Sequence, residues 1–132
     1  MGSEMCIRDR ANLNANGLDG SQHQFVTMDI GEFMRRHKPG EVYDLVVCDP
    51  PTFSNSKRTD QDWNVQTDAV PLLKDVLKLM RPNGVIFFST NFRRFKFDTG
   101  ALDASAIHEI STQTVPEDFR NRRIHRCWRI VK

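Results

Sequence analysis

The chain has 132 residues, of which 39% are hydrophobic and 27% are charged, a balance typical of one small ordered domain and not of a disordered tail. Its formal net charge is only +2, so overall charge does not by itself indicate nucleic-acid binding. No apolar run approaches the roughly 20 residues of a membrane-spanning helix. The three cysteines lack the spacing of a disulfide framework or a zinc site. We therefore expect a cytoplasmic protein without a metal.

The first ten residues do not join naturally to the rest of the chain. They resemble the translated read-through of a sequencing adapter fused to a fragmentary gene. We therefore expect residues 1–10 to be a non-native leader and residues 11–132 to be one partial domain.

Three short elements are predicted before residue 40. Residues 11–18 have the pattern of a helix end stopped by Gly17, because glycine adopts the left-handed cap conformation without a steric penalty. Residues 24–28 form a short β-type run that ends before Asp29. Apolar positions at helical spacing then predict a helix over residues 30–37.

Two longer strands flank an amphipathic helix. Residues 43–48 are apolar and β-branched, which predicts a strand buried on both faces of a parallel sheet and ending at Asp49. Residues 65–80 have helical periodicity, with Pro71 requiring a kink or a later helix start. Residues 84–89 predict a second buried strand.

Short β-like runs follow at residues 109–114 and 124–131. Alternating strands and helices imply a parallel sheet covered by helices, and in such sheets ligands bind beyond the carboxyl ends of the strands. Asp29, Asp49 and residues 89–91 all follow or end predicted strands. We therefore expect the functional site at that edge.

The motif Asp49-Pro50-Pro51-Thr52-Phe53 carries the predicted chemistry. Two consecutive prolines fix two φ angles and supply no backbone donors, so the loop should be stiff. Phe53 offers a flat apolar surface on which a base can stack, and Asp49 with the prolyl carbonyls offers acceptors for its exocyclic hydrogens. The alternative is a plain turn with Phe53 in the core. We expect Cys48 to pack in its strand and not to act as a nucleophile.

In this context the sequence resembles the ribosomal RNA large subunit methyltransferase K/L family. The most specific stretch is Asp-Pro-Pro-Thr-Phe-Ser-Asn-Ser-Lys-Arg at residues 49–58, and supporting matches lie at 12–18, 119–122 and 124–128. The resemblance covers nearly everything from residue 11 to residue 132.

The resemblance implies an α/β chain with a partial Rossmann-like class I S-adenosylmethionine-dependent methyltransferase fold, truncated at its amino end and lacking the first strands and the glycine-rich loop. In that family the carboxyl-terminal domain methylates N7 of a guanine in 23S ribosomal RNA, and a separate amino-terminal half methylates guanine N2. The implied cofactor is S-adenosylmethionine, and the implied partner is 23S ribosomal RNA. We expect the chain alone to be inactive.

The resemblance also implies roles for particular residues. It makes Asp49, Pro50, Pro51 and Phe53 the catalytic loop, with Asp49 also meeting the cofactor, and it makes Asp29 a partner of the cofactor's adenine amino group. For Asp29 a plain helix cap is the alternative, because aspartate accepts hydrogen bonds from the free amides at a helix start.

Five basic residues follow strand ends near the predicted site: Lys57, Arg58, Arg93, Arg94 and Lys96. They could pair with RNA phosphates and set the register of binding without reading the sequence. Solvated loop charge is the alternative.

The target atom affects which chemistry is needed. Guanine N7 has an in-plane lone pair, so its methylation depends mainly on alignment and desolvation. Methylation at cytosine C5 normally needs a cysteine adduct, and related enzymes carry that cysteine where this chain has Thr90-Asn91. A noncatalytic RNA-binding module and an RNA methyltransferase with another target base are the alternatives, whereas an oxidoreductase is disfavoured because no dinucleotide glycine fingerprint is visible.

Overall fold

The computed structural model describes residues 4–18, 20–37, 42–54, 62–119, 121 and 124–132. The chain forms two compact units, Met1–His37 and Lys38–Lys132, each with its own internal structure. No helix in the described part of the chain is long and apolar enough to cross a membrane.

The first unit contains α1 (Glu4–Ala15), the 3-10 helix η1 (Gly20–Gln22) and α2 (Ile30–Arg36). The predicted end of α1 is confirmed, because Gly17 has a φ of 65° and follows the helix. The N–H of Leu18 donates to the carbonyl of Leu13 at 3.0 Å, and that of Gly17 donates to Asn14 at 3.1 Å. This pair of bonds closes the helix with a left-handed glycine.

Residues 24–28 do not form the predicted strand. A strand exists only when a neighbour accepts and donates its backbone hydrogen bonds, and no described segment of the first unit provides one. The helix predicted over residues 30–37 is confirmed as α2, with His37 as its C-cap.

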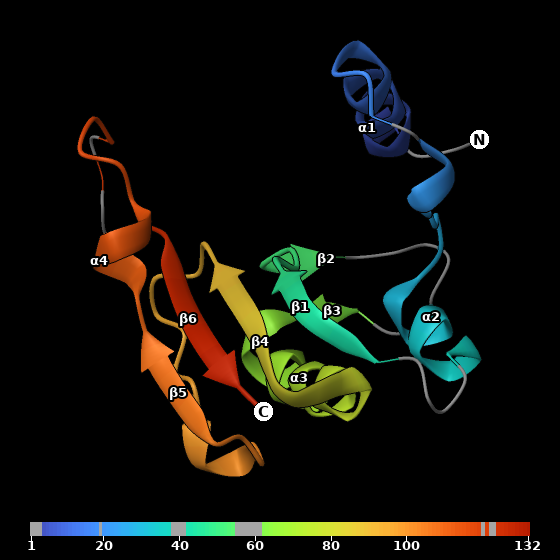
Figure 1. Ribbon diagram of the computed structural model, residues 1–132. Coiled ribbons are helices and arrows are strands. Elements are labelled where there is room, and N and C mark those ends of the chain that lie inside the picture. Colours follow the sequence, from blue (N-terminus) through green and yellow to red (C-terminus); the bar gives the residue numbers. More distant parts are fainter. Residues whose placement is uncertain (1–3, 19, 38–41, 55–61, 120, 122–123) are drawn as a thin grey trace. The chain divides into compact units, whose positions relative to one another are not determined.

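The second unit holds the sheet. Its elements are β1 (Tyr43–Cys48), β2 (Phe53–Ser54), β3 (Trp63–Asn64), α3 (Val65–Leu79), β4 (Met80–Thr90), η2 (Thr99–Ala101), β5 (Ala106–Glu109), α4 (Ser111–Thr114) and β6 (Arg126–Val131). The main sheet has the order β1-β4-β6-β5, and β2 and β3 form a separate two-stranded ribbon. Figure 1 shows the four strands of the main sheet side by side. Only β1 and β4 are parallel, because β6 runs antiparallel to both β4 and β5.

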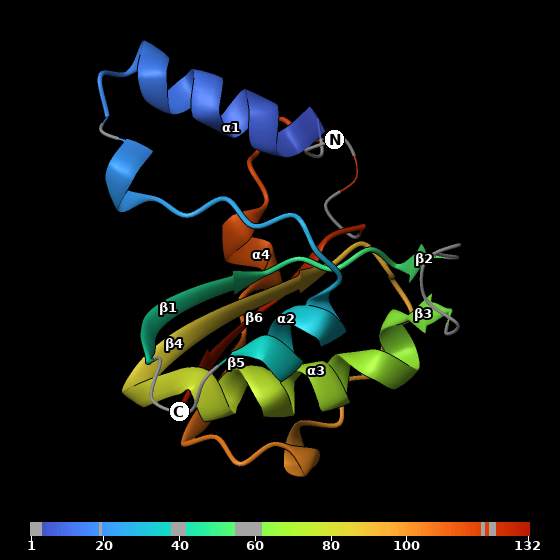
Figure 2. The same ribbon diagram turned by 90° about the vertical axis from the view of Figure 1, so that its right-hand side faces the viewer.

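Helix α3 covers one face of this sheet, as Figure 2 shows. Its buried residues are Val65, Ala69, Leu73, Val76 and Leu77. The facing strands bury Ile86, Phe88 and Ile130 completely. The amphipathic pattern thus correctly predicts the helix, which begins at Val65 and therefore contains Pro71 in its interior. A helix start beyond Pro71 is ruled out.

The expectation that β1 is buried on both faces is wrong. β1 lies at the edge of the sheet, next to β4 alone among the described strands. The exposed fraction is 58% for Leu45 and 72% for Val47. Val46 and Cys48 are half-buried, because they pair with the buried Ile86 and Phe88 on the covered face.

Strand β4 begins four residues earlier than predicted, at Met80. Asn83 has a φ of 64°, so the backbone turns through the left-handed region inside this element. At Gly84 a Cβ atom would lie 2.9 Å from the carbonyl oxygen of Arg81 and 3.2 Å from that of Tyr43. Glycine is required there because β1 and the preceding turn approach the backbone too closely for a side chain.

The strand predicted at residues 109–114 is shifted. β5 ends at Glu109, and residues 111–114 form the short helix α4. The Ser111 hydroxyl explains the turn, because it donates to Glu109 Oε1 at 2.7 Å and accepts the N–H of Cys127 at 3.0 Å. Serine and threonine side chains that bind nearby backbone groups compete with strand pairing.

Candidate functional site

Asp49 lies where the sequence places it, directly after β1 and at the carboxyl edge of the sheet. The hydroxyl of Ser89, near the end of β4, donates to Asp49 Oδ1 at 2.6 Å. The ends of the two parallel strands are therefore joined by a side-chain hydrogen bond. Asp49 is exposed, and among the described residues none donates to its Oδ2. This oxygen is open to an incoming donor.

The loop is anchored through Pro51 and Thr52 to β3 and to the start of α3. Trp63 Nε1 donates to the carbonyl of Pro51 at 2.7 Å, and the N–H of Val65 donates to the carbonyl of Thr52 at 3.1 Å. The Pro51 carbonyl, expected to receive hydrogen bonds from a base, already accepts one from the indole. The loop is thus held by contacts across the chain in addition to its fixed φ angles.

The start of α3 is itself well defined. Asn64 is the N-cap, and its Oδ1 accepts the N–H of Gln66 at 2.9 Å. Asp68 accepts the N–H of Asn64 at 2.7 Å, which satisfies a further free amide at this end. Because Phe53 pairs with Asn64 in the ribbon of β2 and β3, the capped helix positions the end of the loop.

Phe53 is not a core residue, since 59% of it is exposed. Its ring lies 5.9 Å from that of Phe92, centroid to centroid, with an angle of 67° between the ring planes. This is the edge-on geometry that aromatic pairs favour. The alternative of a strand-ending turn with a buried phenylalanine therefore does not fit, and an apolar ring remains open to solvent at the end of the loop that begins with Asp49.

The two described thiols next to the site are protonated at neutral pH. Burial, and secondly the charge of Asp49, raise the pKa of Cys48 to about 11. The same two causes raise the pKa of Cys127, which pairs with Ser89 across the sheet. A protonated, half-buried thiol is a poor nucleophile, so the structure agrees with the packing role expected for Cys48.

Asp29 lies in the first unit, where its Oδ1 accepts the N–H of Glu32 at 3.0 Å and caps α2. The helix-cap interpretation is therefore correct for one of its oxygens. A role at the cofactor's adenine is compatible with capping, because both use a carboxylate at a helix start, and this role stays a prediction.

The predicted phosphate-binding residues fall into two groups. Arg93, Arg94 and Lys96 are exposed on the segment that follows β4, close in sequence to the end of the sheet that carries Asp49. Lys57 and Arg58 lie outside the described residues. The three described residues lie on the same segment as Phe92.

Sequence reasoning missed two neighbours of the loop. Trp63 holds Pro51, and Phe92 contacts Phe53. A signal for Phe92 was available, because an aromatic residue directly after the polar end of a strand has no obvious place in the core. Among the described residues, no group of three histidine, cysteine or acidic side chains is arranged to hold a metal ion.

Comparison with solved structures identifies the fold. A candidate SAM-dependent methyltransferase from Streptococcus mutans superposes with a TM-score of 0.70 at 24% identity, over 93% of this chain and 34% of the other. A candidate methyltransferase complexed with SAH gives a TM-score of 0.66 at 23% identity, over 93% of this chain and 35% of the other. The fold is therefore a partial Rossmann-like fold of the SAM-dependent methyltransferase class, as the sequence predicts.

Curated relatives match nearly the whole chain, although no family model matches it. A ribosomal RNA large subunit methyltransferase K/L from Aliivibrio fischeri is 47% identical over 123 residues, which cover 91% of this chain and 17% of the relative. A ribosomal RNA large subunit methyltransferase K from Neisseria meningitidis is 39% identical over 122 residues, covering 92% of this chain and 34% of the relative. The chain is thus a homologue of the ribosomal RNA large subunit methyltransferase K/L family over nearly its whole length, and it spans a minor part of these relatives.

Proposed function

We propose that this chain supplies the base-side part of an S-adenosylmethionine-dependent methyltransferase that acts on large-subunit ribosomal RNA. The observation that carries the proposal is the loop at residues 49–53, which presents an open carboxylate oxygen and an exposed aromatic ring at one edge of the sheet. A flat base can stack on Phe53 while its exocyclic donors reach Asp49. The names of the curated relatives support the same reaction.

Two carboxylates of this chain, Asp49 and Asp29, are the proposed contacts of the methyl donor. S-adenosylmethionine supplies an electrophilic methyl group on a sulfonium, and in this proposal Asp49 contacts the donor while Asp29 accepts from its adenine amino group. The sequence before β1 contains neither a glycine-rich strand–turn–helix nor an obvious acid for the ribose. We therefore propose that the isolated chain does not transfer methyl groups.

Within this reaction we propose N7 of a guanine in 23S ribosomal RNA as the target. N7 carries a lone pair and no proton, so the site needs no general base to activate it. The raised pKa values of Cys48 and Cys127 keep both thiols protonated, which is compatible with a reaction that needs neither a thiolate base nor a thiolate nucleophile. The N1 and N2 donors of guanine lie opposite its N7 edge, and Asp49 Oδ2 can accept from them.

RNA phosphates would be bound by the cationic residues that follow the strand ends, which are Lys57, Arg58, Arg93, Arg94 and Lys96. Their contacts would set the register of the RNA and make affinity fall with salt. The proposed partner is thus ribosomal RNA, and the compartment expected for such a reaction is the cytoplasm.

A chimaeric enzyme tests this proposal. The 123 matching residues of the Aliivibrio fischeri relative would be replaced by this chain and expressed in cells whose own enzyme has been deleted. We expect 7-methylguanosine to reappear in 23S ribosomal RNA, detected by mass spectrometry of the nucleosides. The Asp49→Ala chimaera should lose about 100-fold in rate, because the base is no longer aligned. An active Asp49→Ala chimaera, or methylation of a different base, would contradict the proposal.

The isolated chain separates this function from noncatalytic RNA binding. Purified chain incubated with labelled S-adenosylmethionine and ribosomal RNA should transfer no label above background, and transfer would refute the proposed inactivity. A noncatalytic module would instead bind ribosomal RNA with an affinity that S-adenosylmethionine does not change, and its chimaera would be inactive.

A further inference from the structure

We infer that Phe92 is a positioning residue for base stacking, because it fixes the ring plane of Phe53 against which the base would lie. The inference rests on the proposed function and extends it to a residue that the sequence motif does not contain. It depends on three observations: the contact between the two rings, the polar contacts that hold the segment after β4, and the separation of Phe92 from the aromatic core.

The ring of Phe53 needs support to act as a stacking surface. It extends from the two-residue strand β2, and 59% of it is exposed, so few contacts limit its rotation. Phe92 supplies the aromatic contact, at 5.9 Å between ring centroids and an angle of 67°. An edge-on neighbour fixes the orientation of a ring and leaves a face available for stacking.

The backbone of Phe92 is held close to the end of β4. Its N–H donates to Thr90 Oγ1 at 3.2 Å, and Thr90 is completely buried. Its carbonyl accepts the N–H of Phe95 at 3.0 Å, which closes a tight turn. The backbone that carries the Phe92 ring is therefore fixed relative to the end of the strand.

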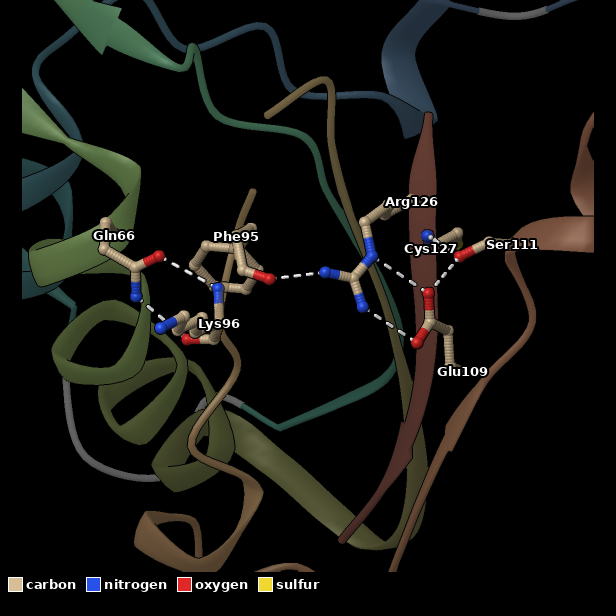
Figure 3. A network of polar contacts seen from close by, with 7 residues as sticks. All are labelled: Gln66, Phe95, Lys96, Glu109, Ser111, Arg126 and Cys127. Carbon is tan, nitrogen blue, oxygen red and sulfur yellow. Dashed lines mark hydrogen bonds and ion pairs between the residues drawn. The ribbon is translucent and has the colours of Figure 1, made fainter. Parts of the chain in front are cut away.

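Two side chains from opposite sides fasten the rest of the segment, as Figure 3 shows. Gln66 of α3 binds the backbone of Lys96 at both groups, accepting its N–H at 2.9 Å and donating to its carbonyl at 2.9 Å. Arg126 of β6 donates to the carbonyl of Phe95. The segment that carries Phe92 is thus fixed to the helix and to the sheet at once.

Arg126 is itself held in place. Its Nε and Nη2 donate to the two carboxylate oxygens of Glu109 at 3.0 Å and 2.9 Å, in a two-pronged pair. Its guanidinium also lies 4.6 Å from the centroid of the Trp128 ring. Because Arg126 is held in place, it fixes the carbonyl of Phe95. The turn in which the Phe95 N–H donates to the Phe92 carbonyl then limits the movement of the Phe92 backbone.

Phe92 is set apart from the aromatic core formed by Phe88, Phe95, Phe97 and Trp128. In that cluster each ring contacts at least two others, at centroid distances of 5.2 to 5.7 Å. The ring contact found for Phe92 is with Phe53 instead. One segment therefore sends Phe95 and Phe97 to the core and Phe92 to the exposed ring of Phe53.

Fluorescence of an RNA probe tests the inference. The full chain would be titrated into a single-stranded RNA oligonucleotide that carries 2-aminopurine at one purine position, because stacking on an aromatic ring quenches this base. We expect Phe92→Leu and Phe92→Met to weaken the quenching titration about 3- to 10-fold, corresponding to the loss of one aromatic contact. Phe92→Tyr, which keeps the ring, should stay within about twofold of the unmodified chain.

Phe97→Leu is the matched control, because it removes a ring of the same segment that faces the core. We expect this variant to melt at a lower temperature and to quench normally while folded, whereas Phe92→Met should quench poorly with little change in melting temperature. Normal quenching by both Phe92→Leu and Phe92→Met would overturn the inference. If either variant fails to fold by circular dichroism, the other and the Phe92→Tyr comparison decide.

Phe53→Leu separates this inference from the proposed function. Quenching that disappears in Phe53→Leu but persists in both Phe92 variants overturns the role of Phe92 alone. Quenching that is the same in Phe53→Leu and the unmodified chain, or no quenching by the unmodified chain, overturns base stacking at this loop and therefore both proposals.

Discussion

At the end of β1 a single carboxylate acts on three neighbouring side chains. Asp49 accepts the hydroxyl of Ser89, and its negative charge raises the pKa of both Cys48 and Cys127. Burial is the larger cause of both shifts, because a thiolate loses more hydration than a thiol when water is excluded. The sheet edge is therefore an environment that tolerates one negative charge and disfavours a second.

Alkylation of Cys48 measures this environment. We expect the rate with iodoacetamide to rise with pH along a titration centred near pH 11, because only the thiolate reacts and the pKa of Cys48 is raised from 9.0 to about 11. In Asp49→Asn the midpoint should fall, yet stay above 9.0, since burial remains. Mass spectrometry of the Cys48 peptide across a pH series from neutral to strongly alkaline gives the profile. A midpoint at or below the ordinary thiol value in the unmodified chain is inconsistent with a buried thiol beside a carboxylate.

The motif allowed two of the site's main features to be predicted. An aspartate and an aromatic residue around two prolines, after an apolar strand, correctly placed Asp49 at the sheet edge, and Phe53 is accessible as stacking requires. The groups that hold them were not predictable in the same way. Trp63 lies 12 residues from Pro51 and Ser89 lies 40 residues from Asp49, so both contacts depend on how the chain folds back.

Among the elements, α3 combines a strong apolar stripe with a residue that opposes helix formation. Pro71 lies inside the helix and is exposed. Proline has no N–H for the carbonyl four residues earlier, and its ring presses against that carbonyl. The buried face of Val65, Leu73 and Leu77 must therefore stabilise the helix enough to offset this cost.

Replacement of Pro71 should stabilise the protein. We expect Pro71→Ala to raise the free energy of unfolding by about 1–3 kcal/mol, because the missing hydrogen bond is restored and an exposed alanine disturbs no packing. Leu73→Ala in the same helix should lower it by about 2–5 kcal/mol, because Leu73 is completely buried. Urea denaturation followed by circular dichroism compares the two. A Pro71→Ala variant that is less stable than the unmodified chain would mean that the proline shapes the helix for its neighbours.

Periodicity predicted the elements that pack and failed for those that depend on a partner. The pattern correctly indicated β1, α3, β4 and β6, because their apolar spacing matches the face that each can bury. Residues 24–28 have the composition of a strand but lack a paired neighbour among the described residues of their unit. A hydrophobic pattern states which surface a segment can bury, whereas pairing decides whether a strand forms. Strand β1 shows the converse: it forms because it pairs with β4, although its Leu45 and Val47 side chains are exposed.

For the whole molecule, the ion pair between Arg126 and Glu109 joins two neighbouring strands of the main sheet. Arg126 of β6 binds Glu109 at the end of β5, and Ser111 of α4 also donates to this carboxylate. The hydrogen bond from Arg126 is the main reason that the pKa of Glu109 lies below its usual value of 4.5. Both partners remain in contact with water, with side-chain exposures of 26% and 42%, so solvent screens the pair.

This pair predicts how acid acts on the fold. Because the pKa of Glu109 is lower in the folded chain, the stabilisation is present above about pH 4.5 and is lost as pH falls through the folded-state pKa. We expect Glu109→Gln to melt at a lower temperature at neutral pH and to lose less stability than the unmodified chain on acidification through this range. Thermal melts at several pH values test this. Parallel pH profiles for the two proteins would show that the pair contributes nothing to acid sensitivity.

The hydrogen bond between Trp63 and Pro51 makes the loop optically visible. The sequence contains two tryptophans, of which Trp128 is 3% exposed in the core and Trp63 is bonded to the loop. Indole emission shifts with the polarity and hydrogen bonding around the ring, so a Trp128→Phe chain would contain a single emitter at the site. Displacement of the Pro51 carbonyl by a bound base would then shift the emission wavelength of Trp63, without any label on protein or RNA.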